Sequence, residues 1–349
     1  MKKIINDIRE KGRLMMLSCC TILGLLLNSC NYWHDSYEGC EELLKTHLKV
    51  QFIYDMNMKF ADAFPHEVKD VTLYAFDQQG KLVYTKTETA GKIIAEEGMN
   101  IDDLTPGIYD LLVWAQGEER YAGSYTFGQA SIGSSACDVL KAMVNRSDKG
   151  IIDHDLTPLF HGQLAKADLT EIKKGGTRTV KFSLTKNTNQ VKVVLQNLSG
   201  VNLSADDFIF QITDNNGKMD YDNSLMEDEM LTYNAWSAYS GTAGVSSGTS
   251  EQTSVACAIA ELTTNRLVKG HDMRLRVWNK STGASIINIP LIDYALMVKG
   301  NYNKSMSDQE YLDRQDSYDL VFFIDENHKW QSASVIINSW RVVLSHADM

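Results

Sequence analysis

The sequence contains 349 residues, of which 44% are hydrophobic and 23% are charged, and its formal net charge is −11. An acidic surface repels phosphates, so the composition argues against a nucleic-acid-binding protein. The length exceeds that of a typical single domain, and we therefore expect two domains, each large enough to bury its own core.

The N-terminus has the pattern of a lipoprotein signal peptide. A basic start precedes an apolar run, Leu14–Leu27, whose length of about 14 residues is too short to cross a bilayer. Leu at position −3, Ser29 at −1 and Cys30 at +1 predict cleavage between Ser29 and Cys30, with residues 1–29 removed and Cys30 lipidated. Acyl chains contribute about 0.8 kcal/mol per buried methylene, enough for stable anchoring. The alternative is an ordinary secretory signal.

Residues 30–46 are expected to form an acidic tether behind the lipid. Three further cysteines follow, Cys40, Cys137 and Cys257, without a Cys-x-x-Cys pair. An odd number without that spacing predicts neither a disulfide framework nor a zinc site. One bridge with a leftover thiol and three free thiols both remain open.

Short apolar runs then predict strands. Alternation from Leu48 to Tyr54 indicates a half-buried strand. Two runs, Val71–Phe76 and Leu82–Thr85, flank Asp77–Gly80 and predict a hairpin. Further expected elements are strands at Ile108–Ala115 and Tyr121–Phe127 and a helix at Ser134–Val144.

The segment Lys173–Gly176 is the most linker-like part of the middle of the chain. It suggests an N-terminal domain of residues 47–176 and a C-terminal domain of residues 177–349. Alternation restarts beyond it, Asn216-Gly217 predicts a hairpin turn, and Ser240–Ser254 predicts a mobile loop. Leu291–Met297 fits a strand or a helix, and the charged Asp308–Asp316 fits a helix. The many short strands predict an all-β protein of two tandem β-sandwiches.

The residues that usually carry chemistry show no catalytic or metal-binding pattern. The histidines lack metal-ligand spacing, and we expect His161 in a loop or turn. The acidic stretch Asp214–Asn223 fails the register of a calcium loop and favours a hairpin. Exposed tryptophans could form a glycan platform, although core or rim packing is the default explanation for Trp33, Trp114 and Trp236. We therefore expect no enzyme and no cofactor.

Several stretches in order along the chain resemble the FimB-type fimbrial anchor and tip subunits of type V pili from Bacteroides-like bacteria. These stretches are Phe52–Met58, Ala61–Phe64, Val71–Asp77, Leu104–Tyr109, Trp114-Ala115, Leu159–Gly162, Asp308–Gln315 and Ile336–Trp340. Each is weak alone, but the ordered set covers nearly the whole chain beyond the signal.

This resemblance implies a surface-exposed outer-membrane lipoprotein of two transthyretin-like β-sandwiches. Such subunits fix the fimbrial shaft to the cell and limit its length. Related subunits polymerise by β-strand addition after an Arg-specific protease removes an N-terminal strand. Here the first Arg after Cys30 is Arg120, so the strand at Leu48–Tyr54 should remain attached to the lipid. That difference favours an anchor over a shaft subunit.

The expected partners are fimbrial shaft subunits and the outer membrane through the lipid, with a host or bacterial surface ligand as an open possibility and no nucleic acid. Val335–Leu344 is the candidate strand for the shaft, because both of its faces carry apolar groups, although it could equally be the last strand of the second sandwich. The alternatives to an anchor are a fimbrial tip adhesin, a surface glycan-binding lipoprotein and, least favoured, a lipoprotein hydrolase.

Overall fold

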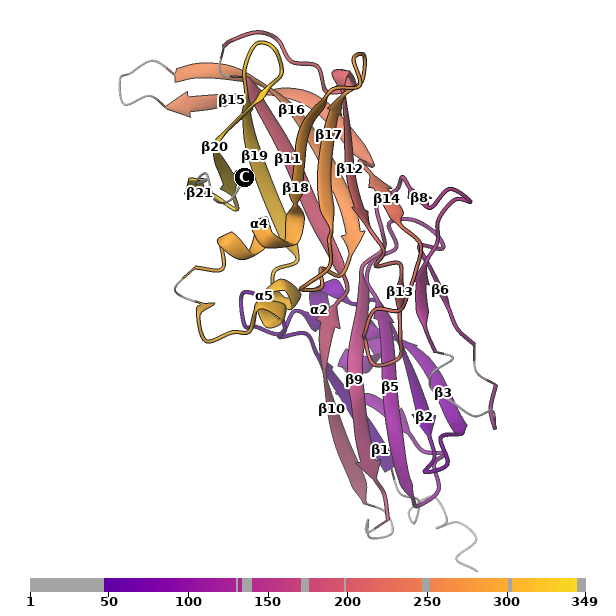
Figure 1. Cartoon of the computed structure of the whole chain (residues 1–349). Helices are drawn as coiled ribbons and strands as arrows, with labels where there is room; N and C mark the ends of the chain where they lie inside the picture. Colours follow the sequence, from indigo (N-terminus) through magenta and orange to yellow (C-terminus); the bar gives the residue numbers. More distant parts are fainter. Residues whose placement is uncertain are drawn as a thin grey trace, which may run out of the picture.

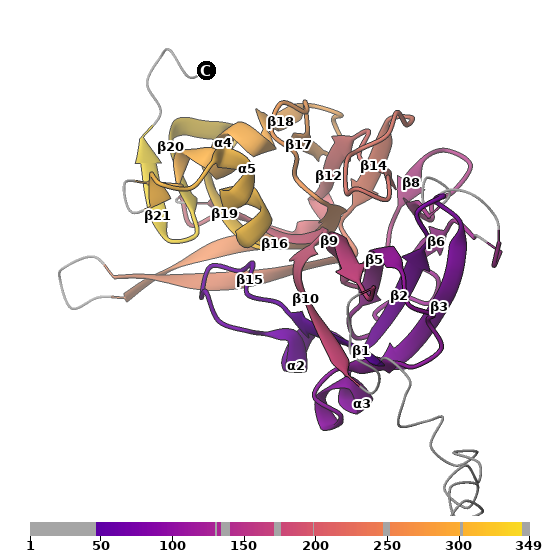
Figure 2. The same cartoon turned by 90° about the horizontal axis from the view of Figure 1, so that it is seen from below.

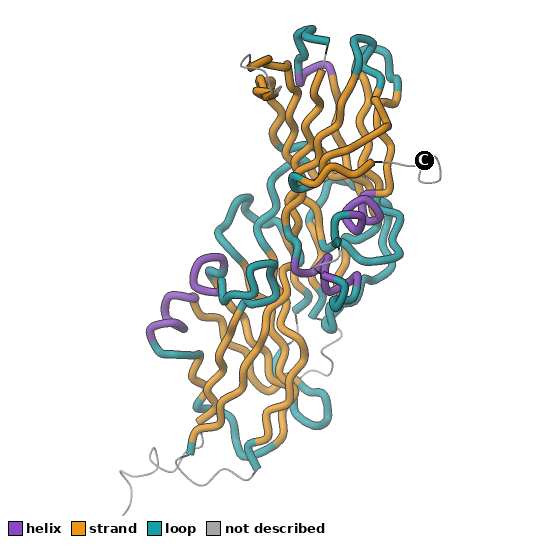
Figure 3. The backbone as a smooth tube through the Cα atoms, turned by 90° about the vertical axis from the view of Figure 1, so that its left-hand side faces the viewer, coloured by secondary structure: helices purple, strands orange, loops and turns teal. Residues whose placement is uncertain are grey.

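The computed structural model describes residues 47–129, 131–133, 140–170, 176–197, 199–246, 252–300 and 303–343. It consists mainly of β-strands, which form two lobes stacked end to end (Figures 1 and 3). The predicted all-β class with two sandwich-like units is therefore confirmed. The expected signal peptide and tether lie outside the described residues.

The first lobe contains seven hydrogen-bonded strands in the order β3-β2-β5-β9-β10-β1-β4. Their bounds are β1 His47–Ile53, β2 Asp70–Phe76, β3 Leu82–Thr89, β4 Met99–Ile101, β5 Ile108–Gln116, β9 Leu159–Asp168 and β10 Thr177–Lys186. The predicted hairpin is confirmed, because β2 and β3 pair antiparallel and Gly80 has a φ of +71° in the turn between them. The strand predicted from Leu48 is confirmed as β1.

Strand β10 folds this sheet over into two layers. Residues Thr177–Ser183 pair in parallel with β1, whereas Leu184–Lys186 pair with β9 in the other layer. Strands that pass between layers in this way make the corners of a sandwich. The buried side chains between the layers include Leu48, Val50, Phe52, Leu73, Val113, Phe160 and Phe182.

The second lobe is a sandwich of two sheets. The six-stranded sheet has the order β15-β16-β11-β19-β20-β21, and the five-stranded sheet has the order β18-β17-β12-β14-β8. Their bounds are β8 Ile151–Ile152, β11 Thr188–Asn197, β12 Phe208–Asp214, β14 Leu231–Asn234, β15 Ser237–Ser246, β16 Gln252–Asn265, β17 Arg274–Asn279, β18 Ser285–Pro290, β19 Ser317–Ile324, β20 Trp330–Ile337 and β21 Trp340–Val343. Alternate residues of the central strands meet between the sheets, including Val193, Ile212, Leu262, Leu275 and Leu320.

The sheets divide later in the chain than the predicted domain boundary. Strand β10, which begins at Thr177, pairs with β1 in the first lobe, and β11 begins the second lobe at Thr188. Asn187 between them is fully buried. Alternation in β10 shows which residues point inward but not which strand is the partner, so the sequence does not reveal that β10 belongs to the sheet of the first lobe.

The segment between β5 and β9 packs on the second lobe. A three-stranded sheet has the order β13-β7-β6, with bounds Lys218–Met219, Ala142–Val144 and Tyr125–Phe127. Tyr125 donates through its hydroxyl to Asn265 Oδ1 at 2.9 Å within the core. The strand predicted from Tyr121 therefore begins later, at Tyr125. The predicted helix Ser134–Val144 is wrong at its C-terminal end, because residues Ala142–Val144 form β7. Residues 134–139 of that prediction lie outside the described residues.

Short helices lie beside the lobes. Their bounds are α2 Phe64–Glu67, α3 Ala90–Ala95, α4 Leu291–Met297 and α5 Asp308–Arg314, and a 3-10 turn spans Ala205–Asp207. The expected helix at Asp308 is confirmed, and Ser307 caps it by accepting from Glu310 N at 3.0 Å. Helices α4 and α5 lie at the end of the second lobe that faces the first (Figure 1).

Of the segment Ser240–Ser254, predicted as a mobile loop, residues 240–246 and 252–254 belong instead to a pair of strands, and residues 247–251 lie outside the described residues. Strands β15 and β16 pair antiparallel from Ser237 opposite Glu261 to Ser246 opposite Gln252. This hairpin projects beyond the body of the lobe as an arm (Figure 2). Its Gly, Ser and Thr residues resemble a loop in composition, but their register continues the pairing of buried residues nearer the core.

The predicted turn at Asn216-Gly217 is also wrong. Strand β12 pairs with β14 and β17 rather than with β13, so this dipeptide does not close a hairpin. A Cβ atom on Gly217 would lie 2.6 Å from Arg146 Nη1, and close packing therefore requires glycine here. Asn216 is fully buried and accepts from the Tyr233 hydroxyl at 2.7 Å.

Candidate functional site

The predicted strand Val335–Leu344 is a hairpin rather than a single strand. Asn338 and Ser339 have φ angles of 48° and 71°, which reverse the chain between β20 and β21. The Asn338 side chain accepts from Asp319 N at 2.7 Å and donates to the Ser317 carbonyl oxygen at 3.2 Å. Short polar side chains tolerate this left-handed backbone, so an Asn-Ser pair stops the strand where apolar alternation alone would continue it.

Strand β21 forms one outer edge of the six-stranded sheet. Trp340 and Val343 expose 61% and 73% of their surfaces, and Arg341 is also exposed. An edge strand presents backbone donors and acceptors to any chain that lies beside it, and exposed apolar side chains on the edge favour such pairing. Within the described residues, β21 therefore presents an edge of the kind to which a further strand can pair.

A groove with a volume of about 530 Å³ lies beside β21. Its walls come from β21, from the segment that follows α4, from α5 and from the loop after β1. Apolar side chains of the lining include Met58, Met297, Val298, Tyr311, Trp340 and Val342. A groove of this kind next to a free edge can accept alternate side chains of an added strand.

An ion-pair cluster holds the wall of this groove in place. Lys299 Nζ donates to the Met306 carbonyl oxygen at 2.6 Å and to Asp308 Oδ1 at 2.8 Å. Lys269 also pairs with Asp308. Hydrogen bonds from the two lysines lower the pKa of Asp308 to about 2. The connection between α4 and α5 is thereby tied to the start of α5.

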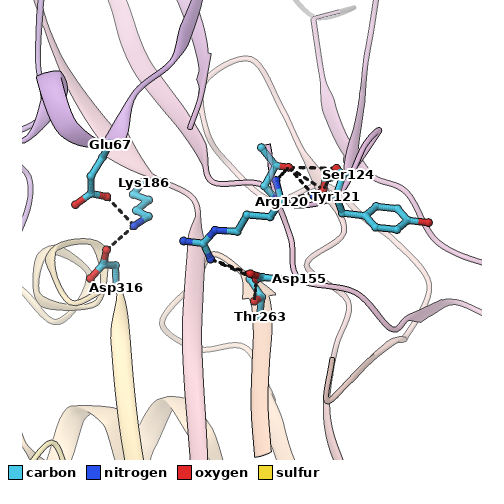
Figure 4. A network of polar contacts seen from close by, with 9 residues as sticks. Glu67, Arg120, Tyr121, Ser124, Asp155, Lys186, Thr263 and Asp316 are labelled. Carbon is cyan, nitrogen blue, oxygen red and sulfur yellow. Dashed lines mark hydrogen bonds and ion pairs between the residues drawn. The ribbon is translucent and has the colours of Figure 1, made fainter. Parts of the chain in front are cut away.

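The two lobes meet at a buried lysine. Lys186, at the end of β10, lies between Glu67 of the first lobe and Asp316 of the second, at 2.8 Å and 2.7 Å (Figure 4). Burial lowers the pKa of Lys186, but Asp316 and Glu67 together raise it above its ordinary value. A charge shared in this way bridges the lobes, because its removal would leave two carboxylates facing each other.

Helix α5 joins the same junction through its last residue. Arg314 Nη1 donates to the Asp55 carbonyl oxygen at 2.9 Å, and its guanidinium lies 4.6 Å from the centre of the Phe60 ring. A second arginine, Arg266, makes a two-pronged contact with Asp313 of α5, with both distances at 2.7 Å. Paired contacts of this type are strong and directional. We refer to Glu67, Lys186, Arg266, Asp313, Arg314 and Asp316 as the junction cluster.

Several stretches that carried the family resemblance meet at this junction. Asp55 of the stretch Phe52–Met58 accepts, through its carbonyl oxygen, from Arg314 of the stretch Asp308–Gln315. His161 is in the middle of β9 and is fully buried, so its predicted place in a loop or turn is wrong. Its Nε2 donates to the Tyr221 carbonyl oxygen at 2.8 Å, and its ring meets Trp114 edge-on. Burial lowers the pKa of His161 to about 4.

Several of the other predicted site residues lie outside the described residues. Ser29, Cys30 and Cys40 precede the described residues, and Cys137 falls within residues 134–139, which are also outside them. Cys257 is a free, buried thiol in β16, and burial raises its pKa. Trp114 is buried in the core, as the default explanation predicts, whereas Trp236 is 38% exposed.

The junction cluster was not found from the sequence. Its members come from α2, β10, the end of β16 and α5, which are far apart along the chain, and a lone Lys or Arg has no distinguishing neighbour in sequence. Only the charged stretch Asp308–Gln315 gave a signal, through its resemblance to a family motif. Side chains that meet only after folding need the topology before they can be paired.

The described residues contain neither a metal centre nor a helix that could span a membrane. Within them, no group of three or more His, Cys, Asp or Glu side chains has the arrangement of a metal site. Among the same residues, no helix is both long and apolar enough to span a bilayer.

Comparisons with known proteins place the chain among fimbrial proteins. A sequence model of the family described as fimbrillin-A associated anchor proteins Mfa1 and Mfa2 matches residues 37–346. The minor fimbrium anchoring subunit Mfa2 of Porphyromonas gingivalis is 21% identical over 285 residues, which cover 80% of each chain. The solved structure of that fimbrial anchor protein has a TM-score of 0.63 and covers 86% of this chain and all of its own, which supports the fold.

Two solved structures from Bacteroides thetaiotaomicron VPI-5482 are more similar in sequence. One, described as a candidate adhesin, is 31% identical with a TM-score of 0.73, over 86% of this chain and 99% of that one. The other, described as a candidate polysaccharide-binding protein, is 28% identical with a TM-score of 0.72, over 87% of this chain and all of that one.

Proposed function

The chain belongs to the family of fimbrillin-A associated anchor proteins, and we propose that it tethers a fimbrium to the outer membrane through lipidated Cys30. The family consists of fimbrial anchor subunits, so a role at the cell surface in association with fimbrial subunits follows from membership. The lipid, the limit on fimbrial length and the mode of joining to the shaft are the parts that we propose.

The observation that carries the proposal is the position of β1. This strand pairs with β10 on one side and with β4 on the other, and it contributes Leu48, Val50 and Phe52 to the core of the first lobe. The sequence from Cys30 to β1 contains no Arg. A protease that needs Arg therefore has no site between the lipid and β1. We infer that the first lobe stays complete and stays attached to the membrane.

The opposite end of the chain is the proposed attachment point for the shaft. Strand β21 is an edge, and the adjoining groove is lined largely by apolar side chains. A strand of the first shaft subunit would pair with β21, and its alternate side chains would enter the groove. Because the first lobe keeps its own strand, growth would stop at this subunit, which would set the base and limit the length of the fimbrium.

Deleting the gene, or replacing Cys30 with Ala, tests the proposal. We expect fimbriae that assemble, are shed into the medium and grow abnormally long, as counted by electron microscopy of cells and culture medium. A Cys40→Ala variant is the matched control and should retain cell-bound fimbriae. Fimbriae of normal length that stay on the cell in the Cys30→Ala strain would contradict the proposal.

A further inference from the structure

A second groove lies on the outer face of the six-stranded sheet, away from β21. It has a volume of about 430 Å³, and its lining includes Arg120, Gln190, Lys192, Trp236, Glu261 and Asp319. We call it the sheet-face groove. Its floor is formed by β16, β11 and β19, whose opposite side chains fill the core of the sandwich.

The floor of the sheet-face groove carries ordered rows of polar groups. Lys192 on β11 lies opposite Glu261 on β16 and Asp319 on β19. Gln190 is two residues earlier on the same face and lies opposite Ser317. Adjacent strands are about 4.8 Å apart, so donors and acceptors repeat across the floor at a spacing close to the width of a sugar ring.

Residues on both sides of the groove are held in place by hydrogen bonds and ion pairs. Arg120 Nη1 contacts Asp155 Oδ2 at 3.2 Å, and Asp155 accepts in turn from the Thr263 hydroxyl (Figure 4). At the other side Trp236 is 38% exposed and is fixed by its backbone N–H, which donates to the Glu261 carbonyl oxygen at 3.0 Å. The Glu261 carboxylate accepts from the Tyr239 hydroxyl at 3.4 Å. Trp236 and Glu261 thus both line this side of the groove.

Most of the charged side chains of the groove are already paired with one another. Arg120 is paired with Asp155, and Lys192 Nζ lies 3.8 Å from Asp319. An ionic ligand would have to compete with these internal ion pairs, whereas a neutral ligand leaves them in place. The remaining capacity is for hydrogen bonds with a neutral group, from carboxylate, amide and hydroxyl atoms. A polypeptide strand cannot pair here either, because β11 is already bonded to strands on both sides.

From this combination we propose that the sheet-face groove binds a neutral saccharide. Trp236 would stack on the apolar face of one sugar ring, and Glu261 and Gln190 would bond its hydroxyls. Few convergent polar groups beside one aromatic ring are the usual means of fixing a small polar ligand. The site is independent of the anchor role, because it lies on the face of the sheet and not at its edge.

The test uses the purified lipidated protein in detergent and a panel of neutral trisaccharides of glucose, mannose or galactose. Binding is measured by saturation-transfer NMR and by calorimetry. We expect at least one trisaccharide to bind at millimolar concentration. Trp236→Ala should weaken this binding about tenfold or more, and Glu261→Gln, which keeps the shape of the side chain, should weaken it severalfold. Trp340→Ala, in the groove beside β21, is the control and should leave the affinity for the trisaccharide unchanged.

Three results would overturn the proposal. One is the absence of binding to every neutral trisaccharide at millimolar concentration. Another is binding that neither Trp236→Ala nor Glu261→Gln weakens while both variants keep the circular dichroism of the wild type, because the saccharide would then bind elsewhere. The last is Trp236-dependent binding of oligoglucosamine or a lysine peptide in place of the neutral sugars, which would identify a site for cations.

Discussion

The junction between the lobes and the edge at β21 use opposite kinds of surface. At the junction, Lys186 is shared between two carboxylates and Arg314 reaches across to the backbone of the first lobe. At the edge, Trp340 and Val343 are exposed. Removing one partner of a buried ion pair destabilises the fold, because the other charge is left without a partner. An exposed apolar edge strand costs the free protein little stability, and its backbone groups gain hydrogen bonds when another strand pairs with it. The junction thus has the character of a fixed joint, and under the proposed function the edge at β21 would receive the partner.

The largest effect on folding should come from Asp313→Ala in the junction cluster. It leaves the Arg266 guanidinium partly buried without its carboxylate, and the free energy of unfolding should fall by about 3 to 5 kcal/mol. Urea unfolding followed by circular dichroism measures this change. The double variant Arg266→Met with Asp313→Leu should recover most of the loss, because no charge is left alone. A loss below about 0.5 kcal/mol for Asp313→Ala would show that the pair is not part of the joint.

Acidification should weaken the packing around His161. Its pKa is about 4 in the folded chain against 6.5 for an ordinary histidine, so only the unfolded chain takes up a proton between these values. Stability from this residue is therefore complete above pH 6.5 and falls by up to about 3 kcal/mol as the pH is lowered to 4. The measurement is the slope of the free energy of unfolding against pH between 4 and 6.5, compared between the wild type and His161→Phe. The exposed His66→Phe is the control, and an unchanged slope in His161→Phe would contradict the assignment.

A smaller loss is expected for Lys186→Met. The two carboxylates are about one-third exposed, so water can reach part of each when the lysine is gone. We expect the free energy of unfolding to fall by about 1 to 2 kcal/mol, measured by thermal and urea unfolding. Lys181→Met on the exposed face of the same strand should change it by less than about 0.5 kcal/mol. Equal effects of the two variants would argue against the bridge.

The smallest effect on stability should accompany the largest effect on the proposed assembly. Trp340→Lys places a charge on the exposed edge and should change the free energy of unfolding by less than about 0.5 kcal/mol. It should nevertheless reduce the amount of shaft subunit that copurifies with the protein. Met230→Lys is the matched control, since Met230 is also 61% exposed but lies away from β21. Copurification that is equal in both variants would exclude β21 as the attachment point.

The sequence predicted the strands better than their partners. Alternation located β1, and Asp77–Gly80 located the first hairpin, because both signals are local. It could not place β10 in the first sheet or recognise that Asn338 and Ser339 reverse the chain. Both depend on neighbours from distant parts of the chain: β1 in one case and the backbone of β19 in the other. The N-terminal domain of residues 47–176 stays a prediction, and the position of β10 argues for extending it to residue 186.

The candidate sites were predicted only in part. Trp236 was named from the sequence among possible glycan contacts, but its neighbours Gln190, Lys192 and Glu261 converge through the register of the sheet. Lipidation at Cys30 stays a prediction from a local pattern, since Cys30 lies outside the described residues. That prediction needs only a local motif, whereas a groove on a sheet can be recognised only when strand order is known.

The position of the protein along the fimbrium tests the central claim most directly. Gold-labelled antibody against this chain can be imaged by electron microscopy on fimbriae still attached to cells, with the Cys30→Ala strain beside the wild type. An anchor predicts label only where the shaft meets the membrane in the wild type, and label at one end of shed fimbriae in the Cys30→Ala strain. Label at the end far from the cell would contradict the account and identify a tip subunit.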